Sequence, residues 1–133
     1  NHYNYYEQLN QRISKNILKI KKYLKEFINQ GGEIIAFGAS HSTTTLLYLL
    51  NAEEFPIQYI IDDNLIKQGR YSPGLNIPVI SPYSIKENDE KKKRLIICLA
   101  WQHSRSILKK HLGNLSETCW LVPFPELNLI FPV

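Results

Sequence analysis

The chain has 133 residues, of which 44% are hydrophobic and 21% charged, a composition that suits one globular domain and excludes a disordered segment. No apolar run approaches the roughly 18–20 residues of a membrane helix and no signal-peptide pattern is visible, so a cytoplasmic protein without a membrane partner is predicted. The net charge of +4 comes largely from dispersed lysines rather than from arginines clustered with aromatic residues, which argues against nucleic acid and favours small anions such as phosphates.

One long amphipathic helix is predicted over about residues 4–30. Isoleucine, leucine and phenylalanine recur there at spacings of three and four, with lysines and other polar residues between them. Gly31 and Gly32 are expected to end this helix. We therefore divide the chain into a connector helix, residues 1–32, and a single domain body, residues 33–133.

Short apolar runs after the helix predict the strands of a sheet, and helical patterns separate them. Strands are expected at residues 33–37, 57–61, 78–80, 95–100 and 118–122, and the Pro-rich tail has room for a sixth around 127–131. Helices are expected at 44–51 and at 104–112, and Ser81-Pro82 is expected to open a short helix with Pro at its first position. Alternating strands and helices predict an α/β fold, a Rossmann-like three-layer α/β/α sandwich with a parallel sheet and the extra N-terminal helix.

The two cysteines point to no metal chemistry. Cys98 and Cys119 each lie inside an apolar run, and neither belongs to a CxxC or Cys/His spacing. We expect two reduced, buried thiols and no metal site within this chain.

The first candidate ligand loop follows the first predicted strand. Ligands of open α/β sheets bind beyond the carboxyl ends of the strands, and backbone amides at a helix start favour an anion such as phosphate. The loop matches neither the GxGxxG nor the GxxxxGK[ST] pattern, so neither NAD nor ATP is indicated, and simple N-capping would also explain it. His41 is a candidate general acid or base, although a loop histidine is more often only exposed. The loop consists of Gly38, Ala39, Ser40, His41, Ser42 and Thr43.

Three further strand-end segments carry polar or aromatic candidates. An acidic residue after the second strand can accept from a ribose diol, and Asp62 lies 24 positions after Gly38, although an ordinary turn explains it equally well. Basic side chains can pair with phosphate or simply be solvated, and an indole beside an amide can stack on a ring or cap the core. The candidates are Asp62, Asp63 and Asn64; Lys67, Arg70 and Tyr71; and Trp101, Gln102 and His103.

Three stretches of the sequence resemble the C-terminal domain of three-part S-adenosylmethionine-dependent sugar C-methyltransferases, a family of bacterial sugar biosynthesis. They are IDDNLIKQGRYSPGLNIPVISP, GASHSTTTLLYLLN and LAWQHSRSIL, and they occur in the family's order over most of residues 33–110. The sequence departs from the family at His41 with the threonines that follow it, and at Gln102, where an Asn is expected.

The resemblance implies that the chain is the nucleotide-sugar-binding part of such an enzyme. A zinc module and a central domain, which binds S-adenosylmethionine and holds the main catalytic residues, would precede it, and a first residue other than Met fits a fragment of a longer protein. The chain alone is therefore expected to bind no cofactor and to be inactive, with a nucleotide-linked sugar and the upstream methyltransferase domain as partners. Two alternatives stay open: a nucleotide-sugar module of another enzyme, such as a bacterial sugar acetyltransferase, or an interaction domain without a ligand.

Overall fold

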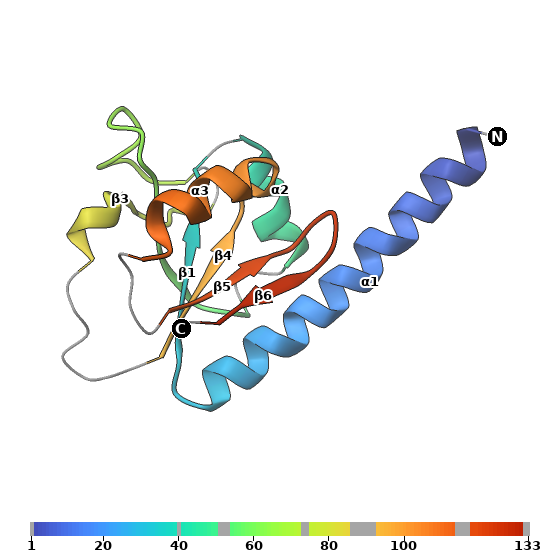
Figure 1. The fold of residues 1–133 in the computed structure, drawn as a ribbon, viewed down its shortest axis with the longest axis horizontal. Helices are drawn as coiled ribbons and strands as arrows, with labels where there is room; N and C mark the ends of the chain where they lie inside the picture. The colour runs from blue at the N-terminus through green and yellow to red at the C-terminus, as the bar shows by residue number, and fades with distance from the viewer. Residues whose placement is uncertain are drawn as a thin grey trace.

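The fold is a mixed α/β arrangement of a six-stranded sheet and a long N-terminal helix (Figure 1). A computed structural model describes residues 2–39, 41–50, 54–72, 75–85, 93–113 and 118–131. In chain order the elements are α1 (His2–Asn29), β1 (Glu33–Phe37), α2 (His41–Leu49), β2 (Ile57–Ile61), β3 (Val79–Ile80), the 3₁₀ turn η1 (Pro82–Ser84), β4 (Arg94–Cys98), the 3₁₀ turn η2 (Trp101–His103), α3 (Ser104–His111), β5 (Thr118–Val122) and β6 (Asn128–Ile130).

Most predicted elements are confirmed, and several of their boundaries differ by one to three residues, most clearly at the start of α2 and the end of β4. The helix α2 begins at His41 rather than at residue 44, because the Ser and Thr residues that favour turns by their own hydrogen bonds can also enter the first turn of a helix. The strand β4 ends at Cys98 rather than at residue 100. The amides of Leu99 and Ala100 both donate to the carbonyl of Phe37, at 2.9 and 3.3 Å, so the chain already bends over the end of β1.

The strands run in the order β3-β2-β1-β4-β5-β6, and the first five are parallel. The predicted parallel pairing is confirmed for β1 to β5, whereas the sixth strand, β6, pairs antiparallel with β5 through Trp120 opposite Ile130 and Val122 opposite Asn128. Only residues 123–127 join the two strands, whereas a parallel crossover needs about a dozen residues or more. A hairpin is therefore the connection that this length permits.

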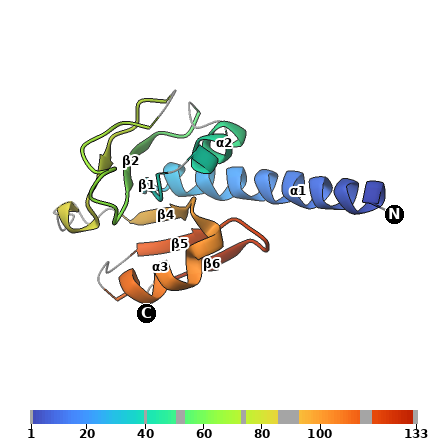
Figure 2. The same cartoon turned by 90° about the horizontal axis from the view of Figure 1, so that it is seen from above.

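Alternate residues of the strands face two different hydrophobic clusters, as the period of two of a strand requires. Ile34 and Ala36 of β1 face a cluster that contains side chains of α1 and α2, whereas Ile35 and Phe37 face a cluster that contains Ile107 and other side chains of α3. Side chains of helices thus pack in both clusters, and α3 lies apart from α1 and α2 (Figure 2). This two-sided burial explains the continuously apolar strand sequences.

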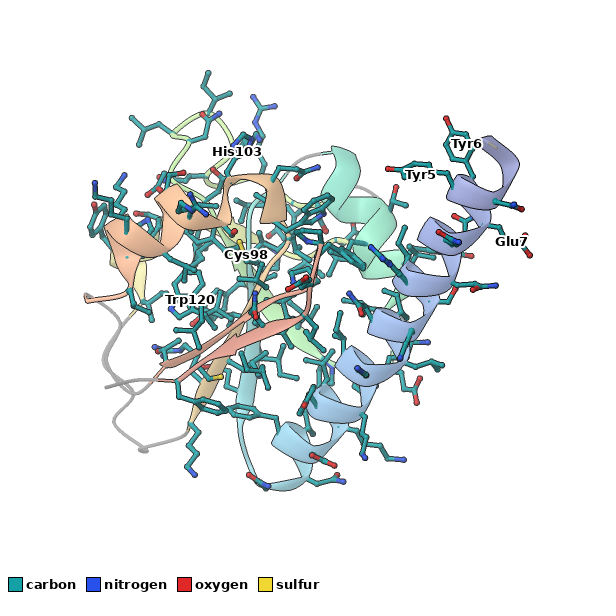
Figure 3. All side chains as sticks on the ribbon, turned by 45° about the vertical axis from the view of Figure 1, so that its right-hand side comes forward. Tyr5, Tyr6, Glu7, Cys98, His103 and Trp120 are labelled. Atoms are coloured by element: carbon teal, nitrogen blue, oxygen red, sulfur yellow. The ribbon has the colours of Figure 1, made fainter. Side chains whose placement is uncertain are left out.

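The helix α1 packs on the sheet with its C-terminal half and extends beyond it with its N-terminal half. Ile20 and Leu24 are fully buried against β1 and its neighbours, while Tyr5 and Tyr6 are 64% and 61% exposed at the far end (Figure 3). Its 28 residues correspond to about 42 Å of helix, much longer than a five-residue strand. Among the described helices, none is both long and apolar enough to cross a membrane.

Candidate functional site

The carboxyl ends of β1, β2 and β4 lie side by side, because β1 pairs with β2 on one side and with β4 on the other. The amide of Gly38 donates to Ile61 at 2.9 Å, and the amide of Leu99 donates to Phe37 at 2.9 Å. Strand order reverses between β1 and β4, which is where ligands of open α/β sheets bind. Three of the four candidate segments therefore start at adjacent points along the carboxyl-terminal ends of the strands. We call this end of the sheet the edge.

The loop after β1 is tightly packed where it leaves the strand. Gly38 has a φ of +103°, and a Cβ atom added there would lie 2.8 Å from the Cβ and 3.1 Å from the amide nitrogen of Ala100. Both the backbone conformation and the close approach of the β4 end require glycine. Ser40 lies outside the described residues, and the backbones of His41, Ser42 and Thr43 form the first turn of α2.

Asp62 connects the loops after β1 and β2. Its Oδ2 accepts a hydrogen bond from the amide of Ala39, and its Oδ1 accepts one from the amide of Asn64, each at 2.8 Å. The carboxylate is thus used by the protein itself, although each oxygen keeps a second lone pair for a ligand hydroxyl. One of the backbone amides expected to hold phosphate, that of Ala39, is already bound to a carboxylate.

Asp63 binds a different part of the protein. Its Oδ2 lies 2.9 Å from Nε2 of His111 and its Oδ1 lies 3.3 Å from Nζ of Lys110, both at the end of α3. Burial alone would raise the pKa of Asp63, but the hydrogen bonds and charges of His111 and Lys110 bring the pKa below its ordinary value. Two adjacent carboxylates, both proposed from the sequence as ligand contacts, therefore have separate structural partners.

The segment after Asp63 is an ordered loop that turns back along β3. Oδ1 of Asn64 accepts from the amide of Ile66 at 3.0 Å, and Nε2 of Gln68 donates to the carbonyl of Asp62 at 2.8 Å. The amide of Gly69, with a φ of +84°, donates to Val79 at 2.8 Å. The bond from Ile66 to the side chain of Asn64 is that of an Asx turn, in agreement with the ordinary turn that the sequence analysis gave as the alternative.

Within the described residues, this loop carries two basic side chains without an acidic neighbour at ion-pair distance. Lys67 is half-buried and Arg70 is exposed, while Tyr71 is 67% exposed and forms a bridge with Pro78. The contact of these two cations with a phosphate stays a prediction.

The segment after β4 forms η2 and leads into α3. Trp101 is half-buried, and its ring meets that of Phe124 edge-on at a centroid distance of 5.7 Å. This contact is the one expected of a tryptophan that caps the core. Gln102 and His103 are exposed, and Figure 3 shows His103 near the start of α3, with Cys98 in the interior of the domain.

Two residues that sequence reasoning missed organise this edge. Gln68 holds the carbonyl of Asp62, and His111, only 1% exposed, lies against the ring of Phe37 at 5.2 Å as well as against Asp63. His111 follows Ile107 by four positions, so its place on the apolar side of a helix was the available signal. No sign of this role for Gln68 is present in the sequence, apart from its place in the segment KQGRY (residues 67–71), which resembles the family.

The sequence makes predictions for the two cysteines and for possible metal ligands. Burial raises the pKa of the Cys98 thiol to about 12 and also raises that of Cys119, and both cysteines are free and buried, as predicted. Among the described residues, no group of three His, Cys, Asp or Glu side chains is placed to hold a metal ion. A cleft of about 520 Å³ lies between α1 and β6, lined by Tyr23, Leu129 and others, and includes no residue of the strand-end loops.

The chain belongs to a family of methyltransferase domains. The sequence profile described as "C-methyltransferase C-terminal domain" matches residues 1–125, which confirms the family predicted from the KQGRY region. Among individual proteins, the chain is 25% identical over 115 residues to the C-methyltransferase NovU of Streptomyces niveus. That match covers 84% of this chain and 26% of NovU, so the matched part is about a quarter of the relative's length.

Proposed function

We propose that this chain is the nucleotide-sugar-binding C-terminal domain of a cytoplasmic, S-adenosylmethionine-dependent sugar C-methyltransferase, and that it is not active alone. The family membership supports the methyltransferase class. In this proposal residues 33–133 are a Rossmann-like three-layer sandwich and residues 1–32 are the connector to the upstream methyltransferase domain. The strand order, which runs 3-2-1-4-5-6, supports this assignment.

One observation carries the ligand part of the proposal: the loops after β1, β2 and β4 meet at the point where the strand order reverses. A nucleotide-linked sugar needs hydrogen-bond donors for its diphosphate and acceptors for its hydroxyls. The start of α2 with Lys67 and Arg70 would supply the donors, and Asp62 and Asn64 would supply acceptors. Gln102 and His103 would border the sugar.

The methyl donor is assigned to another part of the enzyme. S-adenosylmethionine supplies an electrophilic methyl group when it is bound, and the preceding domain would hold it together with the main catalytic residues. The described part of this chain offers no glycine-rich GxGxxG loop, and the amide of Ala39 is bound to Asp62, so we assign no residue here to the cofactor.

A thermal-shift screen of dTDP-, UDP-, GDP- and CDP-linked sugars against this chain tests the proposal. A ligand at 100 times its dissociation constant stabilises the folded state by about 2.7 kcal/mol, which raises Tm by several degrees in a domain of this size. We expect one nucleotide class to raise Tm. An interaction domain without a ligand would give no rise with any of the four.

A charge-matched pair of variants then locates the site. Lys67→Ala with Arg70→Ala should weaken calorimetric binding of the ligand by tenfold or more, since charge-assisted hydrogen bonds contribute roughly 1.5–3 kcal/mol each. Lys15→Ala with Lys25→Ala removes the same charge from exposed positions of α1 and should leave the affinity within about twofold. Equal affinities of the two double variants would remove Lys67 and Arg70 from the site.

A further inference from the structure

Asp62 joins segments that are separate in sequence. Besides the bonds of its carboxylate to the amides of Ala39 and Asn64, its own amide donates to Ile80 at 3.1 Å and its carbonyl accepts from Gln68 at 2.8 Å. Asp62 thus links three segments by hydrogen bonds: the loop after β1, its own loop and β3. Hydrogen bonds to an ionised carboxylate are about twice as strong as neutral ones, so these contacts restrict the edge strongly.

The bond from Ala39 to Asp62 lies between the end of β1 and the start of α2. Ala39 comes directly after Gly38, which is packed against Ala100 on the β4 side. Asp62 holds the next residue from the β2 side, so the chain is fixed from both directions just before α2 begins at His41. The direction in which the first amides of α2 are presented therefore depends on Asp62.

We propose that Asp62 is a positioning residue of this edge, which orders the loop after β1 and keeps anions away from Ala39. The amide of Ala39 already donates to a carboxylate, and a phosphate oxygen at the same amide would lie against that negative charge. The anionic part of a ligand is thereby directed to other donors. This inference rests on the proposed function for the identity of the ligand, but not for the role of Asp62 in the loop.

The neighbouring carboxylate provides a matched control. Asp63 binds His111 and Lys110 on α3, and no described bond of its side chain reaches the loop after β1. Asp62→Asn and Asp63→Asn therefore remove the same charge from adjacent positions but disturb different contacts. An asparagine at position 62 has one acceptor oxygen instead of two, so its NH2 group would face one of the two backbone amides that donate to separate oxygens of Asp62.

The experiment measures amide exchange in the ligand-free protein by NMR, followed by binding of inorganic pyrophosphate and of the nucleotide sugar found in the screen. Ala39 lies outside the regular strands and helices, so its bond to Asp62 is the contact expected to protect its amide. Protection of this amide in the wild-type chain is therefore a test that does not depend on the folding of a variant. In Asp62→Asn the exchange of Ala39 or Asn64 should accelerate roughly ten- to a hundredfold. In Asp63→Asn both amides should keep their wild-type rates.

The two ligands distinguish positioning from general stability. Asp62→Asn should weaken nucleotide-sugar binding about tenfold, while pyrophosphate should bind equally or more tightly because a negative charge has been removed. An unprotected Ala39 amide in the wild type, or unchanged exchange at Ala39 and Asn64 in Asp62→Asn, would overturn the inference, as would a parallel loss of both ligands. If no nucleotide sugar binds the wild type, the proposed function fails, and the amide exchange still decides the role of Asp62.

Discussion

Replacing Gly38 with alanine should destabilise the domain more than the same replacement at Gly69. Both glycines have positive φ, +103° and +84°. A Cβ at position 69 meets no atom within 4 Å, so that variant carries backbone strain alone, about 1–2 kcal/mol. At position 38 the new methyl group would also lie 2.8 Å from the Cβ of Ala100, and such overpacking adds about 1–3 kcal/mol. We expect a total of about 2–5 kcal/mol for Gly38→Ala.

Urea unfolding followed by tryptophan fluorescence measures both costs, because Trp120 is fully buried in the folded state. A shift of the midpoint with an unchanged slope reports a change in stability. A double-mutant cycle with Ala100→Gly isolates the steric part, since that change removes the nearer of the two contacts. A cost of Gly38→Ala no larger than that of Gly69→Ala, or a cycle without favourable coupling, would refute the proposed close approach of the β1 and β4 ends.

Three smaller predictions concern single side chains. Leu24→Ala should lower the free energy of unfolding in urea by about 2–5 kcal/mol, because Leu24 is fully buried. Leu18→Ala, at a 70% exposed position of the same helix, should change it by no more than about 0.5 kcal/mol. Similar costs for the two variants would contradict the packing of α1. The contacts of Asp63 with His111 and Lys110 lower its pKa, so the stability they contribute is present at neutral pH and is lost as the pH falls below about 4 through that lowered value. The stability difference between the wild type and Asp63→Asn should accordingly shrink in acid, and a constant difference from pH 7 to pH 2 would exclude this linkage. Burial raises the pKa of Cys98 to about 12, so peptide mapping should find it unmodified by iodoacetamide in the native protein and modified in urea; equal labelling in both would be inconsistent with a buried thiol.

Local patterns in the sequence were sufficient for most of the secondary structure. The stripe containing Ile17, Ile20 and Leu24 predicted α1, and continuous apolar runs predicted β1, β2 and β5 with the bounds that the structure has. These patterns are reliable here because a helix that covers a sheet and a strand buried on both faces leave few positions for polar residues. The boundary of α2 was less predictable, since Ser and Thr occur both in turns and in the first turn of a helix.

The candidate site could be predicted as a set of loops but not as a set of contacts. The carboxyl ends of parallel strands meet at one edge, so naming the loops after β1, β2 and β4 required only the strand assignment. Asp62 and Asp63 are chemically identical neighbours, and the sequence offered no reason to separate them. One binds Ala39, 23 positions away, and the other binds His111, 48 positions away.

By itself, the sequence determined the family, the helices and strands, and the region in which a ligand would be sought. The tertiary structure alone decided that Trp101 packs on Phe124 and that the amide of Ala39 is bound by a carboxylate. The physical reason is the range of the interactions: helix and strand patterns arise from residues a few positions apart, whereas these contacts join segments that become neighbours only through the order of strands in the sheet.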